Sequence, residues 1–142
     1  MITCTRKLHF DSAHRVVNHE SKCKMLHGHR YVVEVSFIAN NGLDELGRVI
    51  DFSVVKEKLK TWIDENWDHN TILWEKDVSL GGLIEKELSQ KIFYLPHNPT
   101  AENMAVYLLE EICPKLFAGE NVKCIKIKLS ETPNCYAEVV GS

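Results

Sequence analysis

The stretch RYVVEVSFIA, residues 30–39, constrains the fold more than any other part of the chain. It is rich in β-branched and aromatic residues, which favour strands. Successive side chains of a strand point to opposite faces. The apolar face consists of Tyr31, Val33, Val35 and Phe37. The other face carries Glu34 and Ser36, and the turn signal Asn40-Asn41-Gly42 follows. We therefore predict a sheet with one face packed against an apolar layer.

Three further segments predict strands. Residues 3–10 alternate in character and indicate a first strand. Residues 122–129 alternate apolar side chains with lysines, which is typical of a half-solvated strand. A short last strand, residues 135–140, follows the turn Thr132-Pro133-Asn134.

Two segments change to helical spacing. In residues 51–66 the apolar side chains recur every three or four positions, and Ser53 is the expected N-cap. Residues 100–117 form the second predicted helix, with Thr100 as N-cap. We expect Pro114 to fray its final turn, because proline lacks the N–H that a helix needs.

The middle segment, residues 72–96, is less regular, and residues 80–93 after Gly81-Gly82 are a candidate third helix. The order of elements is two strands, a helical middle and two strands. We predict one α+β domain over residues 1–142, with a four-stranded antiparallel sheet and two main helices on one face. A chain of 142 residues can bury a hydrophobic core of its own.

The net charge and the cysteine content argue against several classes of partner and of structural module. The formal net charge is −3, and lysines and arginines are scattered among acidic residues, so we expect neither nucleic acid nor an anionic membrane as a direct partner. The 5 cysteines include no Cys-x-x-Cys pair, which argues against a disulfide framework or a cysteine-rich zinc module. No signal peptide or membrane-length apolar run is visible, so we expect a cytoplasmic protein.

The motif His27-Gly28-His29 is the first candidate site. On a strand both histidines project from one face, and His14 upstream supplies a third imidazole. Neutral imidazole suits zinc, and three protein ligands leave the fourth position open, as in a catalytic zinc site. Cys23 lies close enough in sequence to act as a base or nucleophile beside that position. The alternative is ordinary surface histidines and a small buried cysteine.

Two more groups of residues are candidates for catalysis or substrate binding. Asp68 and His69 follow the first helix, and a carboxylate beside an imidazole can set its tautomer and raise its basicity. The alternative is a helix C-terminus without further function. Glu131 ends an amphipathic strand, where its carboxylate could accept two parallel hydrogen bonds from a guanidine-like ring edge. The alternative is a solvated turn residue.

Six motifs occur in one order along the chain: Phe-x-x-Ala-His, Cys-x-x-x-His-Gly-His, Asp-Phe at a helix start, Asp-His-Asn, Pro-Thr-Ala-Glu-Asn and Ser-Glu-Thr-Pro. In that order they resemble the 6-pyruvoyltetrahydropterin synthase and 6-carboxytetrahydropterin synthase family, over about residues 8–140. The resemblance implies the tunnelling fold, in which subunits join into trimeric β-barrels that stack into hexamers. It also implies active sites at subunit interfaces.

The resemblance also implies roles for single residues. The zinc ligands are His14, His27 and His29. Cys23 resembles the general base, and Asp68 with His69 resembles the pair that assists it from a neighbouring subunit. Glu131 resembles the carboxylate that anchors the pterin ring.

Thr100 and Glu102 resemble flanking pterin contacts, although both also suit helix capping. Lys24 and Arg30 are candidates for the triphosphate, with solvated surface charge as the alternative. Two features depart from the family pattern: Trp67 replaces a small aliphatic residue, and the segment 72–96 is long. Neither touches an expected ligand.

The spacer of three residues between Cys23 and His27 resembles the bacterial type of queuosine biosynthesis. The expected reaction is conversion of 7,8-dihydroneopterin triphosphate to 6-carboxy-5,6,7,8-tetrahydropterin, with loss of acetaldehyde and triphosphate. The alternatives are the pyruvoyl-forming reaction, which eliminates triphosphate only, and a non-catalytic zinc- and pterin-binding protein.

Overall fold

The computed structural model describes residues 1–21 and 24–141. Its centre is a sheet in the order β4-β3-β1-β2-β5-β6. Four of these strands pair antiparallel, as the sequence predicted. They are β1 (Cys4–His14), β2 (His27–Ala39), β5 (Val122–Thr132) and β6 (Cys135–Val140).

The prediction of a purely antiparallel, four-stranded sheet is wrong. Two short strands, β3 (Thr71–Trp74) and β4 (Ile92–Leu95), extend the sheet to six and run parallel to each other, and β3 runs parallel to β1. Each has only four residues, most of them apolar, which is too short to reveal a strand period. The connection between them contains α3 (Val78–Leu88), so the third helix starts before Gly81 and ends before the predicted boundary.

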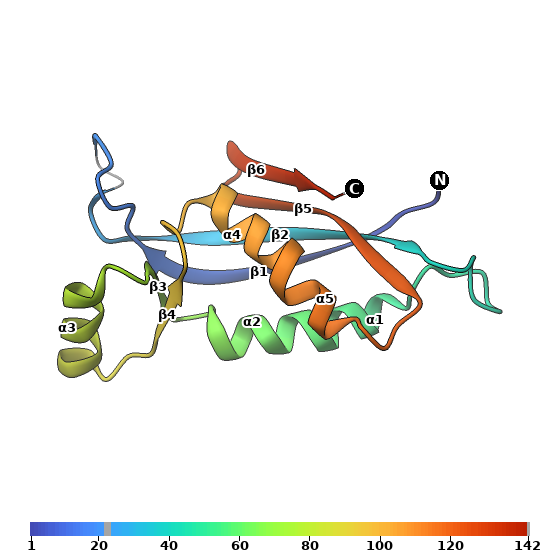
Figure 1. Cartoon of the computed structure of the whole chain (residues 1–142), viewed down its shortest axis with the longest axis horizontal. Coiled ribbons are helices and arrows are strands. Elements are labelled where there is room, and N and C mark those ends of the chain that lie inside the picture. The colour runs from blue at the N-terminus through green and yellow to red at the C-terminus, as the bar shows by residue number, and fades with distance from the viewer. Residues whose placement is uncertain (22–23, 142) are drawn as a thin grey trace.

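Two long helical runs pack on one face of the sheet (Figure 1). The first comprises α1 (Phe52–Val55), the π-helical segment η2 (Lys56–Lys60) and α2 (Thr61–Asn66). The second comprises α4 (Ala101–Tyr107), the π-helical segment η3 (Leu108–Ile112) and α5 (Cys113–Leu116).

The helix ends agree in part with the predictions. Thr100 is confirmed as an N-cap, because its side chain accepts a hydrogen bond from the N–H of Asn103. Asp51, and not Ser53, caps the first run: its carboxylate accepts from the N–H and hydroxyl of Ser53. Pro114 does not end its helix, because it stands at the start of α5, directly after a π-helical segment that has already changed the hydrogen-bond register.

The core lies between the helices and the predicted apolar face of β2. Each of Tyr31, Val33, Val35 and Phe37 is 0% exposed. The helices contribute the equally buried Val55, Leu59, Ile63, Met104 and Leu108. Among the residues that the structure describes, no helix is long and apolar enough to cross a membrane.

The strands β1 and β2 extend beyond their predicted bounds, and this extension positions the site. Their pairing continues to the residue pair His14 and His27, with Ser12 opposite His29. All three histidines therefore stand on paired strands at one end of the sheet.

Candidate metal centre

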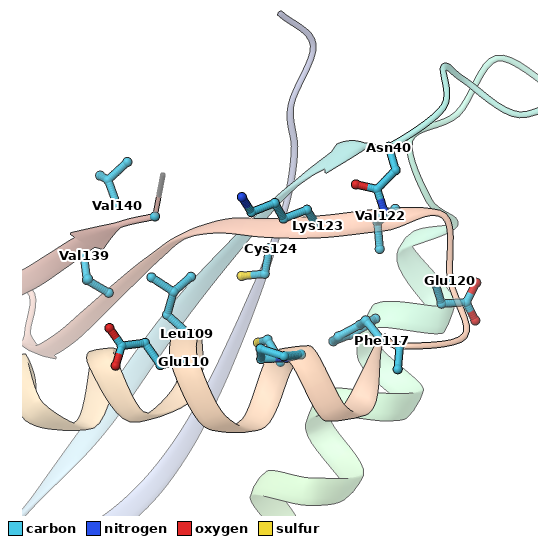
Figure 2. A pocket seen from close by; sticks show the side chains of 14 residues that line it. Asn40, Leu109, Glu110, Phe117, Glu120, Val122, Lys123, Cys124, Val139 and Val140 are labelled. Carbon is cyan, nitrogen blue, oxygen red and sulfur yellow. The ribbon is translucent and has the colours of Figure 1, made fainter.

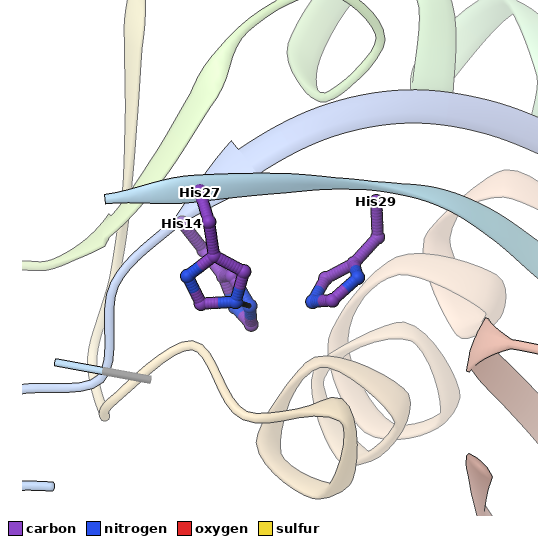
Figure 3. Close-up of side chains that lie close together, drawn as sticks. All are labelled: His14, His27 and His29. Atoms are coloured by element: carbon purple, nitrogen blue, oxygen red, sulfur yellow. Dashed lines mark hydrogen bonds between the residues drawn. The ribbon is translucent and has the colours of Figure 1, made fainter. Parts of the chain in front are cut away.

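The three histidines meet on the helix-facing side of the sheet (Figure 3). The Nε2 atoms of His14 and His27 lie 3.2 Å apart. Each residue offers one ring nitrogen, and all three nitrogens lie within 4.8 Å of one another. We call His14, His27 and His29 the three-histidine centre. The predicted convergence on one face is confirmed.

Backbone carbonyls fix the tautomers of two of these rings. The Nδ1 of His14 lies 2.6 Å from the carbonyl oxygen of Pro99, and the Nδ1 of His27 lies 2.7 Å from that of Met25. A carbonyl oxygen only accepts, so both Nδ1 atoms carry the proton and both Nε2 atoms keep a lone pair. Two lone pairs facing each other at 3.2 Å repel unless a cation lies between them. The arrangement fits a metal ion.

Burial lowers the pKa of two of these imidazoles. His14 is 1% exposed. Its burial, together with the charge of the two neighbouring rings, lowers its pKa to about 4. Burial also lowers the pKa of His29. Neutral imidazole is the form that binds transition metals, so the centre stays ready to bind at neutral pH.

Glu131 faces the same point from β5. Its Oε2 atom lies 3.3 Å from Nε2 of His14 and 3.4 Å from Nε2 of His29. The pairing of β5 with β6 shifts register between Ser130 and Thr132, so Glu131 is the extra residue of a β-bulge. A bulge redirects a side chain, and here the carboxylate turns toward the histidines. The alternative of a solvated turn residue is wrong, because Glu131 lies within β5.

Asp68 and His69 pair directly but lie elsewhere. The Oδ2 of Asp68 is 2.8 Å from Nδ1 of His69, and its Oδ1 accepts a hydrogen bond from the N–H of Asp11. The N–H of His69 in turn donates to the carbonyl of Asp11, with His69 in the left-handed region at φ 58°. His69 lines a shallow depression with Asp11, Arg30 and His29.

The charges of this pair support proton transfer. Burial acts to raise the pKa of Asp68, but hydrogen bonds from Asp11 and His69 outweigh it and lower that pKa. The hydrogen bond to Asp68 raises the pKa of His69, whose side chain is 79% exposed. Among the described residues, the side chains of Asp68 and His69 bond to each other and to the backbone of Asp11, and none of these bonds reaches the three-histidine centre of the same chain.

The remaining predicted site residues lie in different parts of the structure. Thr100 and Glu102 lie in the first turn of α4, directly after Pro99, whose carbonyl contacts His14. Arg30 lies on the outward face and pairs with Asp11 at 3.3 Å, and Lys24 is exposed. The predicted base Cys23 lies outside the described residues.

The chain matches the family model described as 6-pyruvoyl tetrahydropterin synthase over residues 3–142. It belongs to that family. It is 53% identical over 139 residues to a 6-carboxy-5,6,7,8-tetrahydropterin synthase of Rickettsia felis, covering 98% of this chain and 100% of the relative. It is 31% identical to the protein of the same name in Haemophilus influenzae, covering 97% of this chain and 98% of the relative.

Solved structures show the same fold. An uncharacterized protein of Wolinella succinogenes matches with a TM-score of 0.77 at 22% identity, covering 99% of this chain and 98% of that one. The 6-pyruvoyl tetrahydropterin synthase of Caenorhabditis elegans matches with a TM-score of 0.66 at 23% identity, covering 99% and 96%. This chain therefore has the fold of the family.

Sequence reasoning missed the contacts that hold this family member's site together. Asn98 clamps the backbone of Val17 from both sides: its Oδ1 accepts from the N–H and its Nδ2 donates to the carbonyl. Arg15 next to His14 forms a two-pronged ion pair with the buried Asp77. The partners are 81 and 62 residues apart, so no local pattern predicts them. The only signal is a polar residue, Asn98, before a proline.

A wide groove of about 780 Å³ lies away from this chemistry. Figure 2 shows Leu109 and Phe117 on the helical side and Val122, Cys124 and Val139 on the strands. Asn40, which follows β2, also lines it, so the groove lies at the opposite end of β2 from His27. Its lining is mainly apolar, and none of the predicted site residues that the structure describes contributes to it.

Proposed function

We propose that this protein is a zinc-dependent carbon–carbon lyase, a 6-carboxy-5,6,7,8-tetrahydropterin synthase of queuosine precursor biosynthesis. It converts 7,8-dihydroneopterin triphosphate to 6-carboxy-5,6,7,8-tetrahydropterin and releases acetaldehyde and triphosphate. The observation that carries this proposal is the convergence of three imidazole side chains in a chain 53% identical to a protein of that name.

His14, His27 and His29 would hold the zinc ion, because each offers a ring nitrogen to one point and two have their tautomers fixed by carbonyls. When bound, zinc supplies Lewis-acid polarisation of substrate oxygens and lowers the pKa of hydroxyl groups. The bacterial type of reaction is favoured by the relatives, several of which carry the carboxy-forming name at 51–53% identity.

The chain's own residues would orient the substrate and move its protons. Glu131 would accept two parallel hydrogen bonds from the guanidine-like edge of the pterin ring, which fixes the side chain of the substrate toward the histidines. Thr100 and Glu102 would flank the ring from the first turn of α4. Cys23 would act as the general base in the thiolate form.

The Asp68–His69 pair would serve the site of a neighbouring subunit. Its contacts support this arrangement, because among the described residues the side chains of Asp68 and His69 bond to each other and to Asp11 and not to the three-histidine centre. The sheet ends in the edge strands β4 and β6, to which strands of another copy can be added. We infer the tunnelling fold from this: subunits join into trimeric barrels, which stack into hexamers.

The deciding experiment is a mass-spectrometric product assay with 7,8-dihydroneopterin triphosphate, using zinc-loaded and chelated protein. We expect 6-carboxy-5,6,7,8-tetrahydropterin and acetaldehyde from the loaded protein only. A pyruvoyl product would assign the protein to the other reaction of the family. An absence of turnover in the loaded protein would favour a zinc- and pterin-binding protein.

The role of Cys23 has its own test. A general base typically contributes about 10²–10⁴-fold to the rate, so Cys23→Ala should lose turnover by that factor while its zinc content stays at the wild-type level. Cys135→Ala is the matched control, because Cys135 is an exposed thiol on β6. Equal turnover of the Cys23 variant and the control would remove Cys23 from the mechanism.

A further inference from the structure

The segment of residues 98–100 joins the three-histidine centre to the helix α4. The carbonyl oxygen of Pro99 lies 2.6 Å from Nδ1 of His14 and accepts its proton. His14 is 1% exposed, so water has little access to this nitrogen. If the carbonyl pointed elsewhere, the proton could move to Nε2, and a protonated Nε2 has no lone pair for a metal. The direction of one carbonyl group therefore decides whether His14 can act as a ligand.

The peptide unit that carries this carbonyl is fixed at both ends. The C=O of Pro99 and the N–H of Thr100 belong to one planar peptide unit. The N–H of Thr100 donates to the carbonyl of Asn98 at 2.8 Å, while the C=O of Pro99 meets His14. The proline ring restricts φ of residue 99, which favours so tight a turn. Rotation of the peptide plane away from His14 would break the bond to Asn98.

Asn98 is itself fastened on both sides of this turn. Its Oδ1 accepts from the N–H of Val17 at 2.9 Å, and its Nδ2 donates to the carbonyl of Val17 at 3.1 Å. Val17 lies three positions after His14, the last residue of β1. On the α4 side, the carbonyl of Asn98 also accepts from Nδ2 of Asn103 at 2.9 Å. Asn98 therefore links the end of β1 to the start of α4.

Only an amide of this size can make the two bonds to Val17. One atom has to accept from a backbone N–H and the other has to donate to a backbone carbonyl, which asparagine does and an ionised aspartate does not. In Asn98→Asp an oxygen atom replaces Nδ2 and meets the carbonyl oxygen of Val17, and two acceptors at that distance repel each other. The substitution keeps the size of the side chain, so its effect reports on the hydrogen bonds.

We propose that Asn98 is a positioning residue of the metal centre: its hydrogen bonds aim the Pro99 carbonyl at His14 and thereby leave Nε2 of His14 free to bind a metal. The proposal rests on the proposed function, because it takes the three-histidine centre as the zinc site. Among the described residues, Asn98 forms no hydrogen bond to a histidine. Its effect on metal binding therefore passes through Pro99.

The matched control is Asn121→Asp. The side chain of Asn121 also accepts through Oδ1, from Asn41, and donates through Nδ2, to the carbonyl of Gly42. It lies at the opposite end of β2 from the three-histidine centre. The control thus breaks the same kind of amide contact without touching the segment of residues 98–100.

The first experiment observes the His14 ring in metal-free protein by NMR. The ¹⁵N shifts of the ring distinguish a protonated nitrogen from one with a lone pair, and His14→Gln identifies the His14 signals. In wild type and Asn121→Asp the proton should sit on Nδ1. In Asn98→Asp part of the population should carry it on Nε2. A wild-type His14 signal in Asn98→Asp would overturn the proposal.

The second experiment measures metal binding without turnover. Co²⁺ is titrated into metal-free wild type and variants, and the affinity and the visible absorption of bound Co²⁺ are recorded. Asn98→Asp should bind Co²⁺ about 10–100-fold more weakly, the range for groups that orient a metal ligand. Asn103→Ala removes one of the two donors to the Asn98 carbonyl and should fall between Asn98→Asp and wild type. An equal loss in Asn121→Asp would show general destabilisation and refute the inference.

Failure of the proposed function remains distinguishable from failure of this inference. Absence of Co²⁺ binding in wild type would remove the zinc site and the inference together, whereas wild-type affinity in Asn98→Asp would remove the inference alone. Far-ultraviolet circular dichroism and thermal melting establish that each variant is folded. If Asn98→Asp does not fold, Asn103→Ala decides, and a wild-type His14 signal with wild-type Co²⁺ affinity in that variant would overturn the proposal.

Discussion

The three-histidine centre and the Asp68–His69 pair are both placed by the end of β1, yet they hold their imidazoles in opposite ways. His14 is 1% exposed and donates its Nδ1 proton to a neutral carbonyl, and its pKa falls to about 4. The side chain of His69 is 79% exposed and contacts a carboxylate, which raises its pKa. Burial with a neutral partner prepares a ligand, whereas exposure with an anionic partner prepares a group that exchanges protons.

The two clusters contact β1 in different ways, one through its side chains and one through its backbone. Ser12 and His14 point to the helices, and Asp11, which binds Asp68 and His69 through its backbone, points outward. A single strand thus supplies two faces with different chemistry only three residues apart. In an assembly of several copies, each chain could contribute its metal centre to one site and its Asp–His pair to another.

The largest effect should distinguish the two clusters by metal content. His27→Ala removes one of three imidazoles and should abolish stoichiometric zinc binding, because only two nitrogen ligands remain. His69→Ala should keep one zinc per chain, since the His69 side chain is 79% exposed and pairs with Asp68. Metal analysis after gel filtration measures both. Zinc retained in His27→Ala, or lost in His69→Ala, would contradict the assignment of metal binding to the three-histidine centre alone.

The next effect is on the stability of the metal-free protein. The folded-state pKa of His14, about 4, lies below its ordinary value of 6.5, so the unfolded chain binds a proton at a higher pH than the folded chain. Stability should therefore fall as the pH drops from 6.5 toward 4, by an amount on the order of 3 kcal/mol. Urea unfolding of chelated protein at several pH values measures this loss.

The loss should be smaller in His14→Gln, which has no imidazole to protonate at this position. His9→Gln is the control, because His9 is exposed on β1. An unchanged pH dependence in His14→Gln would show that another group causes the loss.

The sequence indicated both clusters but could not place them relative to each other. The Tyr31–Phe37 alternation predicted the buried face of β2, and the spacing of His27 and His29 predicted that both share that face; the structure confirms both. The strands β3 and β4 were missed because each is defined by its partners and not by a local period. The same holds for Asn98 and Val17, which meet across 81 residues.

The helix α3 shows why local sequence patterns did not give the correct helix bounds in the middle segment. The predicted third helix, residues 80–93 after Gly81-Gly82, corresponds to α3, which spans Val78–Leu88 and contains both glycines. A Cβ atom at position 81 would come within 2.0 Å of the Tyr94 hydroxyl, so a larger residue there requires the Tyr94 side chain of β4 to move. The requirement comes from a residue 13 positions away, which single-sequence patterns do not contain.

A smaller effect should appear at the exposed pair. Asp68→Asn removes the carboxylate that stabilises the protonated imidazole, so the pKa of His69 should fall toward its ordinary value. Titration of the His69 ring protons by NMR measures the shift, with the exposed His9 ring as an internal reference. A pKa of His69 that stays where it was would mean that Asp68 orients the ring without charging it.

The smallest effect tests a residue that belongs to both the fold and the proposed site. The Thr100 hydroxyl oxygen accepts the N–H of Asn103 as an N-cap, while its O–H proton remains available to a pterin. Thr100→Val should lower the free energy of unfolding by about 1 kcal/mol, the usual value of a cap, and also weaken pterin binding. Thr100→Ser, which keeps the hydroxyl, should preserve both. If Thr100→Val lost stability but bound pterin with wild-type affinity, Thr100 would serve only as the N-cap of the helix that follows Pro99. The difference between the two clusters would then come from the histidines and their direct partners alone.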